Sequence, residues 1–445
     1  MTQPPGAGYN RGMHIFGTSG IRFKVDYTLL ELAFKCGISA GSRNRRVVIA
    51  RDSRTSSPAL MSALSAGLNA SGASYWDAGL LPTPALAYAA RNFDLGVMIT
   101  ASHNPPEYNG LKFFNPDGTA YNETQQADLE ARILNDASVA VKWTDFGSQY
   151  LLPDAAEAHI EAILTRFSEK YPLRVVVDCG GGAASNEAPL MLRKMGCDVI
   201  ELNCQPDGFF PRPSEPTEEN LLQLKQKVTS TGADLGLAHD GDADRLMAVD
   251  DLGRFINGEA LLVILANAAG AKKVVTTVDA SSVVEEQGFE VKRTLVGDNY
   301  ISKVLKEWGE FGGEPSGSWV FPEFSLCPDG LFAAACLISV AALHKISVLA
   351  DSVPQYPMKR MSVELDRGLI PKIKRQLETL CPARIDRSDG IKLVFPDCWV
   401  LVRPSGTEPK IRLTAQAQNQ TRLELICKQV VDNINIVAGK ELIFK

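Results

Sequence analysis

Residues 95–105 read Leu95-Gly96-Val97-Met98-Ile99-Thr100-Ala101-Ser102-His103-Asn104-Pro105 and join an apolar run to a short polar segment. The apolar run is typical of a buried strand. The Asn-Pro pair that follows stops regular structure, so Ser102 is expected at the exposed end of that strand rather than in the core. A hydroxyl displayed beside an imidazole is a candidate nucleophile. A purely structural strand-end serine is the alternative.

A second polar segment, Asp240-Gly241-Asp242-Ala243-Asp244-Arg245, also follows an apolar stretch, residues 233–238. Three carboxylates at alternate positions repel one another unless a cation holds them. Oxygen ligands of this kind suit Mg²⁺ or Ca²⁺ rather than zinc. An EF-hand requires glycine at the sixth position, where this chain has Arg245; a solvated acidic turn is the remaining alternative. A displayed hydroxyl and a divalent-metal loop together indicate phosphoryl transfer.

The composition is that of an ordinary globular protein. A chain of 445 residues predicts three or four domains. No apolar run approaches the roughly 20 residues of a membrane span, and residues 1–11 do not resemble a signal peptide. Nine cysteines without a paired spacing favour reduced thiols in a cytoplasmic protein. With 52 acidic against 46 basic side chains, we expect no nucleic-acid partner.

Apolar runs alternate with amphipathic stretches over most of the chain, which favours α/β units with largely parallel sheets. The expected strands are residues 47–50, 96–100, 174–178, 198–202, 273–278 and 291–296, and the expected helices are residues 57–71, 186–195 and 299–308. The last ninety or so residues predict an α+β domain, with strands at 391–395, 399–402 and 411–417 and helices at 370–380 and 421–437. Breaks in the pattern predict domains at 1–148, 149–250, 251–354 and 355–445, with a linker at 352–357.

Two further loops are rich in polar groups. Residues 403–409, Arg-Pro-Ser-Gly-Thr-Glu-Pro, offer an arginine, two hydroxyls and a glycine that together form a plausible phosphate cradle. A plain β-turn is the alternative. Residues 312–318, Gly-Gly-Glu-Pro-Ser-Gly-Ser, offer a carboxylate and hydroxyls on a mobile loop, a set suited to sugar hydroxyls, although Gly/Ser loops without function are commoner.

Other basic residues lie beside predicted turns. Segments 16–22 and 51–54 contain arginines for which a structural role is equally open. Lys112 follows Asn109-Gly110-Leu111, so a hairpin would bring its ammonium group back toward Ser102. A surface lysine is the default alternative.

Read together, the motifs TASHNP, DGDADR, GEPSG and RPSGTEP, in that order, resemble the α-D-phosphohexomutase superfamily from Phe16 to the final helix. The resemblance implies three similar α/β domains with mixed sheets plus a C-terminal α+β domain around a central cleft. Residues 205–211 and the turn at 296–298 look most like the phosphoglucosamine-mutase-like branch. The alternative is the phosphomannomutase/phosphoglucomutase branch, which tends to have a histidine-containing loop where Asp298 stands.

The resemblance also implies the chemistry. A phosphoserine at Ser102 would move a phosphoryl group between O6 and O1 of a hexose or hexosamine phosphate through a sugar 1,6-bisphosphate. Mg²⁺ would be held by Asp240, Asp242, Asp244 and an oxygen on Ser102. Lys112, assisted by His103, would transfer protons and would need a lowered pKa. Arg245 would steady the transferring group, and Arg22 would be a further catalytic residue.

By the same resemblance, Glu314 and Ser316 would contact the sugar. Arg403, Ser405, Gly406 and Thr407 would grip the phosphate that does not react. The partner is therefore a small phosphosugar, and the protein a monomer or homodimer. Two positions depart from the family pattern: Ser318 stands where relatives often have histidine, and Phe23 where they usually have glycine.

Two other classes of function agree less well with the sequence. A serine hydrolase or phosphatase using Ser102 and His103 would lack the Gly-x-Ser-x-Gly elbow and would leave the acidic loop without a purpose. A non-catalytic binding homologue would be expected to have lost the serine or an aspartate, and all are present.

Overall fold

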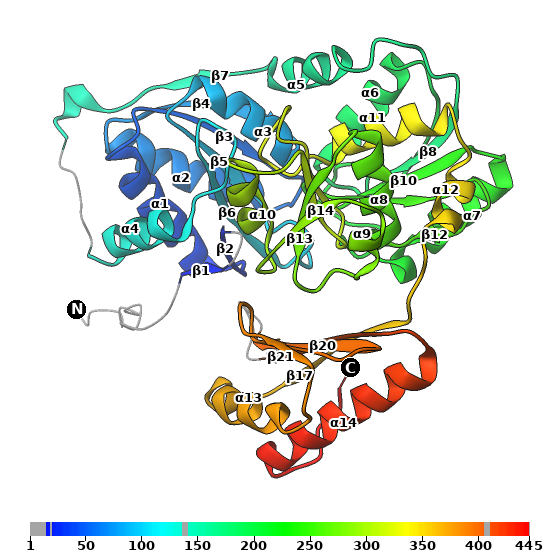
Figure 1. Ribbon diagram of the computed structural model, residues 1–445. Coiled ribbons are helices and arrows are strands. Elements are labelled where there is room, and N and C mark those ends of the chain that lie inside the picture. The colour runs from blue at the N-terminus through cyan, green and yellow to red at the C-terminus, as the bar shows by residue number, and fades with distance from the viewer. Residues whose placement is uncertain (1–14, 18–19, 136–140, 405–409, 445) are drawn as a thin grey trace.

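The computed structural model describes residues 15–17, 20–135, 141–404 and 410–444. Figure 1 shows three α/β units grouped together and a separate C-terminal lobe joined to them by one connection. Each of the four units is built on its own sheet. The expected fold class, three α/β domains with mixed sheets and a C-terminal α+β domain, is confirmed.

The first sheet has seven strands in the order β1-β2-β6-β5-β3-β4-β7. Its elements are β1 (Phe16–Gly17), β2 (Gly20–Lys24), α1 (Tyr27–Gly41), β3 (Arg46–Arg51), α2 (Ser57–Ala70), β4 (Ser74–Leu80), α3 (Thr83–Ala89), β5 (Leu95–Ile99), β6 (Tyr108–Phe114), α4 (Glu123–Leu134) and β7 (Gln149–Leu151). Strand β5 runs parallel to β3 and antiparallel to β6. The sheet is therefore mixed rather than wholly parallel.

The side chains of β3 point alternately to the two faces of this sheet, and this alternation explains why helices cover both faces. Val47 and Ile49 pack in one apolar cluster with residues of α1 and α2, whereas Val48 and Ala50 pack in another with residues of α3. Successive side chains of a strand point to opposite faces, so a continuous apolar run requires helices on both sides. The fully buried strand β5 is held at the centre of this arrangement.

The second and third sheets have the orders β12-β11-β10-β8-β9 and β14-β13-β15-β16. The second unit contains α5 (Ala155–Leu164), β8 (Arg174–Asp178), α6 (Glu187–Lys194), β9 (Asp198–Leu202), α7 (Leu222–Thr231), β10 (Leu235–His239), β11 (Leu246–Val249) and β12 (Phe255–Ile256). The third contains α8 (Gly258–Ala268), β13 (Lys273–Thr277), α9 (Val283–Glu286), β14 (Glu290–Thr294), α10 (Asp298–Leu305), β15 (Phe311–Glu314), β16 (Ser318–Val320), α11 (Gly330–Ala341) and α12 (Ile346–Ser352).

These two units share one apolar core. Residues of β8 and β10 belong to the same buried cluster as residues of α8 and α11. Helix α11 also contacts β10 and β11 of the second sheet. The second and third units are therefore packed as one body, although their sheets are separate.

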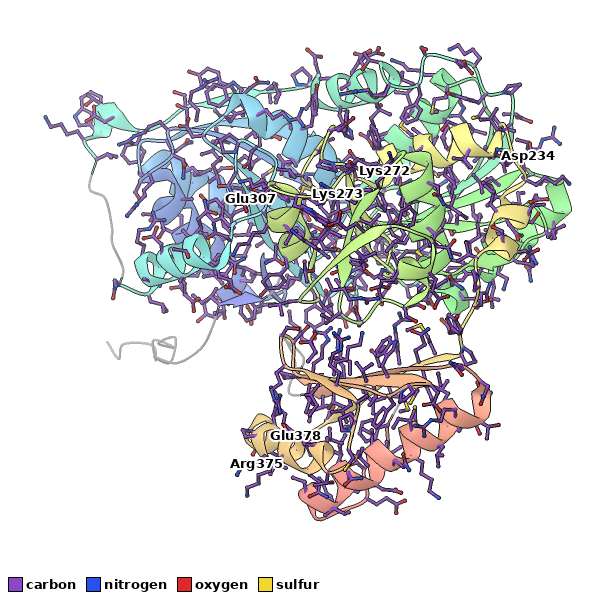
Figure 2. The ribbon with its side chains drawn as sticks, viewed as in Figure 1. Asp234, Lys272, Lys273, Glu307, Arg375 and Glu378 are labelled. Atoms are coloured by element: carbon purple, nitrogen blue, oxygen red, sulfur yellow. The ribbon has the colours of Figure 1, made fainter. Side chains whose placement is uncertain are left out.

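The C-terminal lobe has the sheet order β17-β21-β20-β19-β18. Its elements are β17 (Met358–Glu364), α13 (Ile370–Glu378), β18 (Arg384–Asp386), β19 (Ile391–Val394), β20 (Cys398–Pro404), β21 (Lys410–Ala417) and α14 (Gln420–Ala438). Helix α13 buries Ile373 and Leu377 against the sheet, while Arg375 is exposed on the outer side of the lobe (Figure 2).

The opposite face of this sheet meets the third unit. Trp399 and Leu401 of β20 form a small buried cluster with Val278. The side chain of Gln416 accepts a hydrogen bond from the Ser282 backbone amide at 3.1 Å. This contact fixes the lobe, and with it the end of β20, next to the third unit.

Most predicted elements lie within a few residues of those observed. Strand β7 lies just beyond the expected boundary at residue 148 yet pairs with β4 of the first sheet. Within the described residues, no single helix combines the length and apolar character of a membrane span. The pair α11 and α12 does so jointly but is bent by 97°, and α11 is largely buried in the core.

Candidate active site

Ser102 lies two residues beyond Thr100, at the end of β5, and has a left-handed backbone with φ of 52°. Its amide donates to Thr100 Oγ1 at 2.8 Å, which fixes this turn. Left-handed φ is uncommon for residues other than glycine and is found disproportionately at functional sites. The residue is only 1% exposed, so the expectation of an exposed serine is wrong: its Oγ is buried and donates to Asp240 Oδ2 at 2.9 Å. The structure therefore joins the two motifs from which the sequence argument began.

A buried guanidinium holds the Ser102 loop. Arg54 Nη2 donates to Ser102 O at 2.8 Å and to Asn104 O at 2.7 Å. Its Nη1 donates to Pro105 O at 2.7 Å and to Tyr108 O at 2.9 Å, and its Nε donates to Asp52 Oδ2 at 3.0 Å. The sequence does not distinguish a functional from a structural role for segment 51–54, and these contacts make Arg54 a residue that positions the serine loop.

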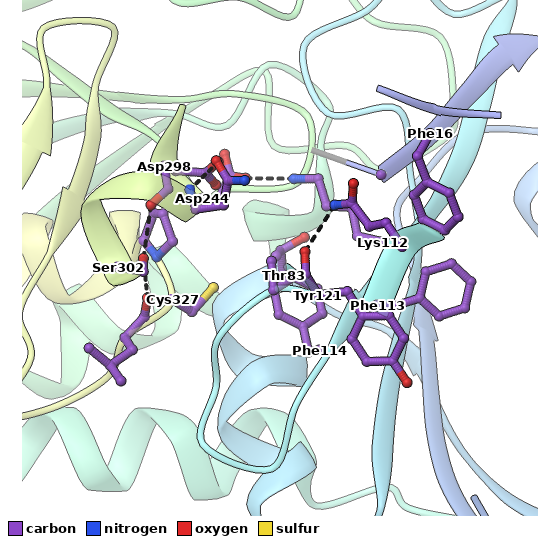
Figure 3. Close-up of a pocket in the computed structure, with 16 residues that line it drawn as sticks. Phe16, Thr83, Lys112, Phe113, Phe114, Tyr121, Asp244, Asp298, Ser302 and Cys327 are labelled. Carbon is purple, nitrogen blue, oxygen red and sulfur yellow. Dashed lines mark hydrogen bonds and ion pairs between the residues drawn. The ribbon is translucent and has the colours of Figure 1, made fainter. Parts of the chain in front are cut away.

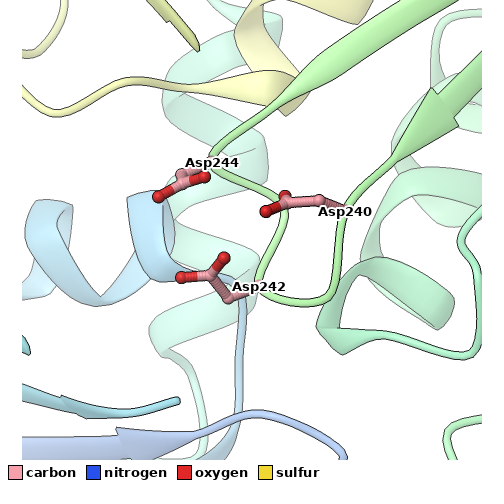
Figure 4. Close-up of side chains that lie close together, drawn as sticks. All are labelled: Asp240, Asp242 and Asp244. Atoms are coloured by element: carbon pink, nitrogen blue, oxygen red, sulfur yellow. The ribbon is translucent and has the colours of Figure 1, made fainter. Parts of the chain in front are cut away.

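The three aspartates of the acidic loop converge (Figure 4). One carboxylate oxygen from each of Asp240, Asp242 and Asp244 lies within 4.8 Å of the others, and all three side chains are buried. Among the described residues, Asp242 Oδ1 and Asp244 Oδ1 are buried without a hydrogen-bond partner. Burial and the neighbouring carboxylates raise the pKa of Asp240 well above its ordinary value. Buried oxygens without partners and mutual repulsion are what a hard divalent cation would relieve, so these residues fit a Mg²⁺ ion.

Lys112 neutralises part of this charge. It lies on β6 opposite Met98 of β5, so the predicted hairpin is present. Its Nζ donates to Asp242 Oδ2 at 2.7 Å and to Asp244 Oδ2 at 2.6 Å. Burial alone would lower the pKa of Lys112, but the charges of Asp242 and Asp244 outweigh it and raise that pKa. The expectation of a lowered pKa is wrong for this arrangement, because the lysine pairs with two carboxylates.

Two further cationic groups and an imidazole surround the serine. His103 Nδ1 lies 3.4 Å from Ser102 Oγ. Burial and the positive charges of Arg245 and Arg22 lower the pKa of His103 well below its ordinary value, so the ring is neutral. Arg22 donates to Asn104 Oδ1 at 3.2 Å, and its Nε is buried without a partner among the described residues. Arg245 pairs with Glu215 at 3.1 Å. The two arginines are therefore close enough to His103 for their positive charges to act on its ring.

The third motif differs from expectation in its local structure. Residues 312–318 form the β15–β16 hairpin, in which Glu314 and Ser318 are buried, instead of the expected mobile loop. The physical reason is the pairing of Glu314 with Ser318 and the packing of Trp319 in the core. Glu314 Oε1 accepts from the Gly297 amide at 2.6 Å, and Oε2 accepts from Ser316 Oγ at 3.0 Å. Burial, followed by the charge of Asp298, raises the pKa of Glu314 to about 7.

The fourth motif begins at the end of β20. Arg403 Nη1 lies 3.8 Å from Asp389 Oδ2, and the same carboxylate accepts from the Val296 amide at 3.1 Å. Asp389 thus links the C-terminal lobe to the third unit, and no sequence signal pointed to it. Ser405, Gly406 and Thr407 lie outside the described residues.

A narrow cavity lies beside this cluster, between the first and third units (Figure 3). Lys112 and Asp244 line one part of it, and Asp298, Ser302 and Cys327 another. Thr83, at the start of α3, also lines the cavity and donates to Asp242 Oδ2 at 2.6 Å. The sequence does not indicate a functional role for Thr83, because its neighbours along the chain form no polar motif. The described site therefore draws on residues from the first three units.

This fold and this cluster define a class of phosphosugar-processing proteins, and comparison with known proteins places the chain within it. Four family models match in order: phosphoglucomutase/phosphomannomutase alpha/beta/alpha domain I at residues 13–140, domain II at 157–253, domain III at 257–356 and the C-terminal domain at 363–433. The chain belongs to the phosphoglucomutase/phosphomannomutase family, which confirms the resemblance seen in the motifs.

Among curated relatives, a protein of Methanocella arvoryzae described as a "probable phosphoglucosamine mutase" is 47% identical over 94% of this chain and 97% of its own length. A protein of Methanosarcina barkeri with the same description is 45% identical over 91% and 96%. A solved phosphoglucomutase/phosphomannomutase family protein of Burkholderia thailandensis has a TM-score of 0.86 and 28% identity, covering 96% of this chain and 99% of that one. The expected phosphohexomutase class is thereby confirmed.

Proposed function

We propose that this phosphohexomutase is a phosphoglucosamine mutase, which moves a phosphoryl group between O6 and O1 of glucosamine phosphate through a phosphoserine and a glucosamine 1,6-bisphosphate. The observation that carries the proposal is the buried contact between Ser102 Oγ and Asp240, beside two carboxylate oxygens that have no hydrogen-bond partner within the described ranges. The description of the archaeal relatives supports the choice of sugar.

In this proposal Asp240, Asp242 and Asp244 would hold Mg²⁺ together with an oxygen on Ser102. When bound, the ion supplies charge neutralisation at the phosphoryl group. Phosphoryl transfer has a loose transition state, so positioning and charge stabilisation do most of the work. Arg54 positions the serine by holding the carbonyls of its loop. Arg22 and Arg245 face the oxygens of the transferring group.

The raised pKa of Lys112 means that it keeps its proton in this arrangement. We therefore assign Lys112 the role of acid, which protonates the sugar oxygen as that oxygen leaves phosphorus. In the opposite half-reaction the same nitrogen, once it has given up that proton, would accept the proton of the attacking sugar hydroxyl. Neutral His103 lies close enough to Ser102 Oγ to assist.

Glu314 and Ser316 are assigned to the sugar hydroxyls, and Arg403 with Ser405, Gly406 and Thr407 to the phosphate that does not react. An arginine offers a bidentate, charge-assisted contact to such a phosphate. We also propose domain boundaries near residues 148, 250 and 354, a linker at 352–357, a cytoplasmic location, and a monomeric or homodimeric state.

The experiment that tests the proposal compares glucosamine-6-phosphate, mannose-1-phosphate and glucose-1-phosphate as substrates of the purified protein, with Mg²⁺ and a trace of sugar bisphosphate. We expect the highest kcat/KM for glucosamine phosphate. A higher kcat/KM for the mannose or glucose phosphate would instead support a phosphomannomutase/phosphoglucomutase. No conversion of any sugar phosphate would overturn the assignment altogether.

A further inference from the structure

The C-terminal lobe faces the rest of the molecule with one side of its sheet, while α13 and α14 lie on the other side (Figure 1). Val400 and Val402 of β20 belong to the core of the lobe. Trp399 and Leu401, which alternate with them, form a buried cluster with the third unit. Successive side chains of a strand point to opposite faces. Arg403 continues the series of Trp399 and Leu401, so it lies on the face that meets the third unit.

A lysine of the neighbouring strand lies on the same face. Lys392 of β19 is paired with Leu401 of β20. Its neighbours Ile391 and Leu393 point the other way, into the core of the lobe. The Lys392 side chain reaches the third unit, where its Nζ donates to Val278 O at 2.6 Å. Only 8% of the residue is exposed, so this bridge between the two units is buried.

An aromatic ring supports the amine of Lys392 inside the lobe. Its Nζ lies 3.8 Å from the centroid of the Trp399 ring, within the range of a cation–π contact. Burial, followed by the charge of Arg293, lowers the pKa of Lys392 to about 7. An amine donates N–H groups in either protonation state. The hydrogen bond to Val278 O therefore does not depend on the charge of the lysine.

A second bridge starts from the same ring. Gln416 of β21 is paired with Trp399 of β20. Its Oε1 accepts from Trp399 Nε1 at 2.7 Å and from the Ser282 amide at 3.1 Å. Its Nε2 donates to Ser282 Oγ at 3.2 Å. Trp399 thus supports both side chains that cross from the lobe to the third unit.

The segment that receives both bridges is fixed within the third unit. This segment, residues 278–282, joins β13 to α9. Arg293 of β14 donates to three carbonyls in and next to it, those of Thr277, Ala280 and Ser281, at 3.0, 2.8 and 2.9 Å respectively. One guanidinium therefore holds the backbone on both sides of Val278. The acceptor of Lys392 has a position that the third unit sets by itself.

We propose that Lys392 is a positioning residue, whose hydrogen bond to Val278 O docks the C-terminal lobe and so keeps Arg403 beside the third unit. The functional part of this inference rests on the role proposed above for Arg403 in binding the phosphate that does not react. An interface made of a small apolar cluster and a few polar contacts permits relative motion of the two parts. Each bridge then adds to the fraction of molecules in which the lobe is docked.

The docked fraction determines how tightly a sugar phosphate is bound. Only a docked lobe presents Arg403 to the ligand, so the apparent affinity falls in proportion to that fraction. Loss of one hydrogen bond shifts a two-state equilibrium by a factor of roughly two to ten. Lys392→Ala should therefore raise KM for every sugar phosphate, by up to roughly tenfold. Saturating substrate restores the docked state, so kcat should stay within about twofold of wild type.

Small-angle X-ray scattering of the ligand-free, full-length proteins tests the docking without a substrate. The radius of gyration should be larger in Lys392→Ala and in Gln416→Ala than in the wild type, and largest in the double variant. Both side chains lie outside the core of the lobe, so far-UV circular dichroism should not change. Lys428→Ala is the matched control, because Lys428 is an exposed lysine of α14, on the other side of the sheet.

Steady-state kinetics with glucosamine-6-phosphate on the same samples tests the link to Arg403. KM should rise in both single variants and most in the double variant, whereas Lys428→Ala should match the wild type. Wild-type scattering from the double variant would overturn the docking role of Lys392. A larger radius of gyration with an unchanged KM would overturn the link to Arg403. Absence of turnover in the wild type would refute the proposed function, and the scattering comparison would then decide the docking role by itself.

Discussion

The replacement Arg54→Lys isolates the hydrogen bonds of a buried guanidinium while keeping its charge. Arginine has five N–H donors, and all five of Arg54 are used, four of them on carbonyls of residues 102–108. Lysine has three donors, so at least two of these five hydrogen bonds are lost. At roughly 1–3 kcal/mol for each, the free energy of unfolding should fall by about 2–6 kcal/mol. Because the lost contacts position Ser102, kcat should fall on the order of 100-fold, with KM changing less.

Urea unfolding followed by tryptophan fluorescence gives the stability change, and steady-state kinetics gives the rest. Arg51→Lys is the matched control: Arg51 is three positions away, and within the described part of the chain its side chain makes one long hydrogen bond, 3.4 Å to Asp52 O. It should stay within about 0.5 kcal/mol of wild type. Equal losses in the two variants would refute the claim that Arg54 organises the serine loop.

Three further outcomes follow from the site. Asp242→Asn should weaken Mg²⁺ binding, measured by calorimetry, and should lower turnover as well, because one of three clustered carboxylates loses its charge. Full activity in excess chelator would contradict the metal assignment. The pKa of Glu314 is raised from 4.5 to about 7, so the stability that its protonated form contributes is lost as pH rises through this range. Between pH 4.5 and pH 8, the free energy of unfolding of Glu314→Gln should therefore rise by up to roughly 3 kcal/mol relative to that of the wild type. A constant difference would disprove the buried-carboxyl account. Arg403→Ala should raise KM for every sugar phosphate by a similar factor, whereas Glu314→Gln should alter the ratio between sugars; the reverse pattern would exchange their roles.

The alternation of apolar runs and turns is sufficient to predict the strands, and the four motifs in their order are sufficient to predict the family. Ser102 and the aspartates could be found because their polarity contrasts with the buried strands just before them. The hairpin to Lys112 followed from the short spacing to β5.

What the sequence could not supply depends on contacts between distant segments. Thr83 and Arg54 are ordinary residues until folding brings them to Asp242 and to the carbonyls of the serine loop. The sequence does not give the direction of the Lys112 pKa shift, because that direction depends on whether burial or the charges of the two carboxylates have the larger effect. The sequence predicts a loop at Glu314 because the glycines and serines of this segment do not reveal the strand pair that the buried Trp319 fixes.

The central claim is that Ser102 carries the phosphoryl group, and intact-mass measurement with phosphosite mapping tests it most directly. The wild type incubated with sugar bisphosphate should contain a fraction heavier by one phosphoryl group, mapped to Ser102. Ser102→Ala should lack that fraction and lose turnover by roughly three orders of magnitude or more. Phosphate on another residue, or a Ser102→Ala variant that retains turnover, would contradict the account.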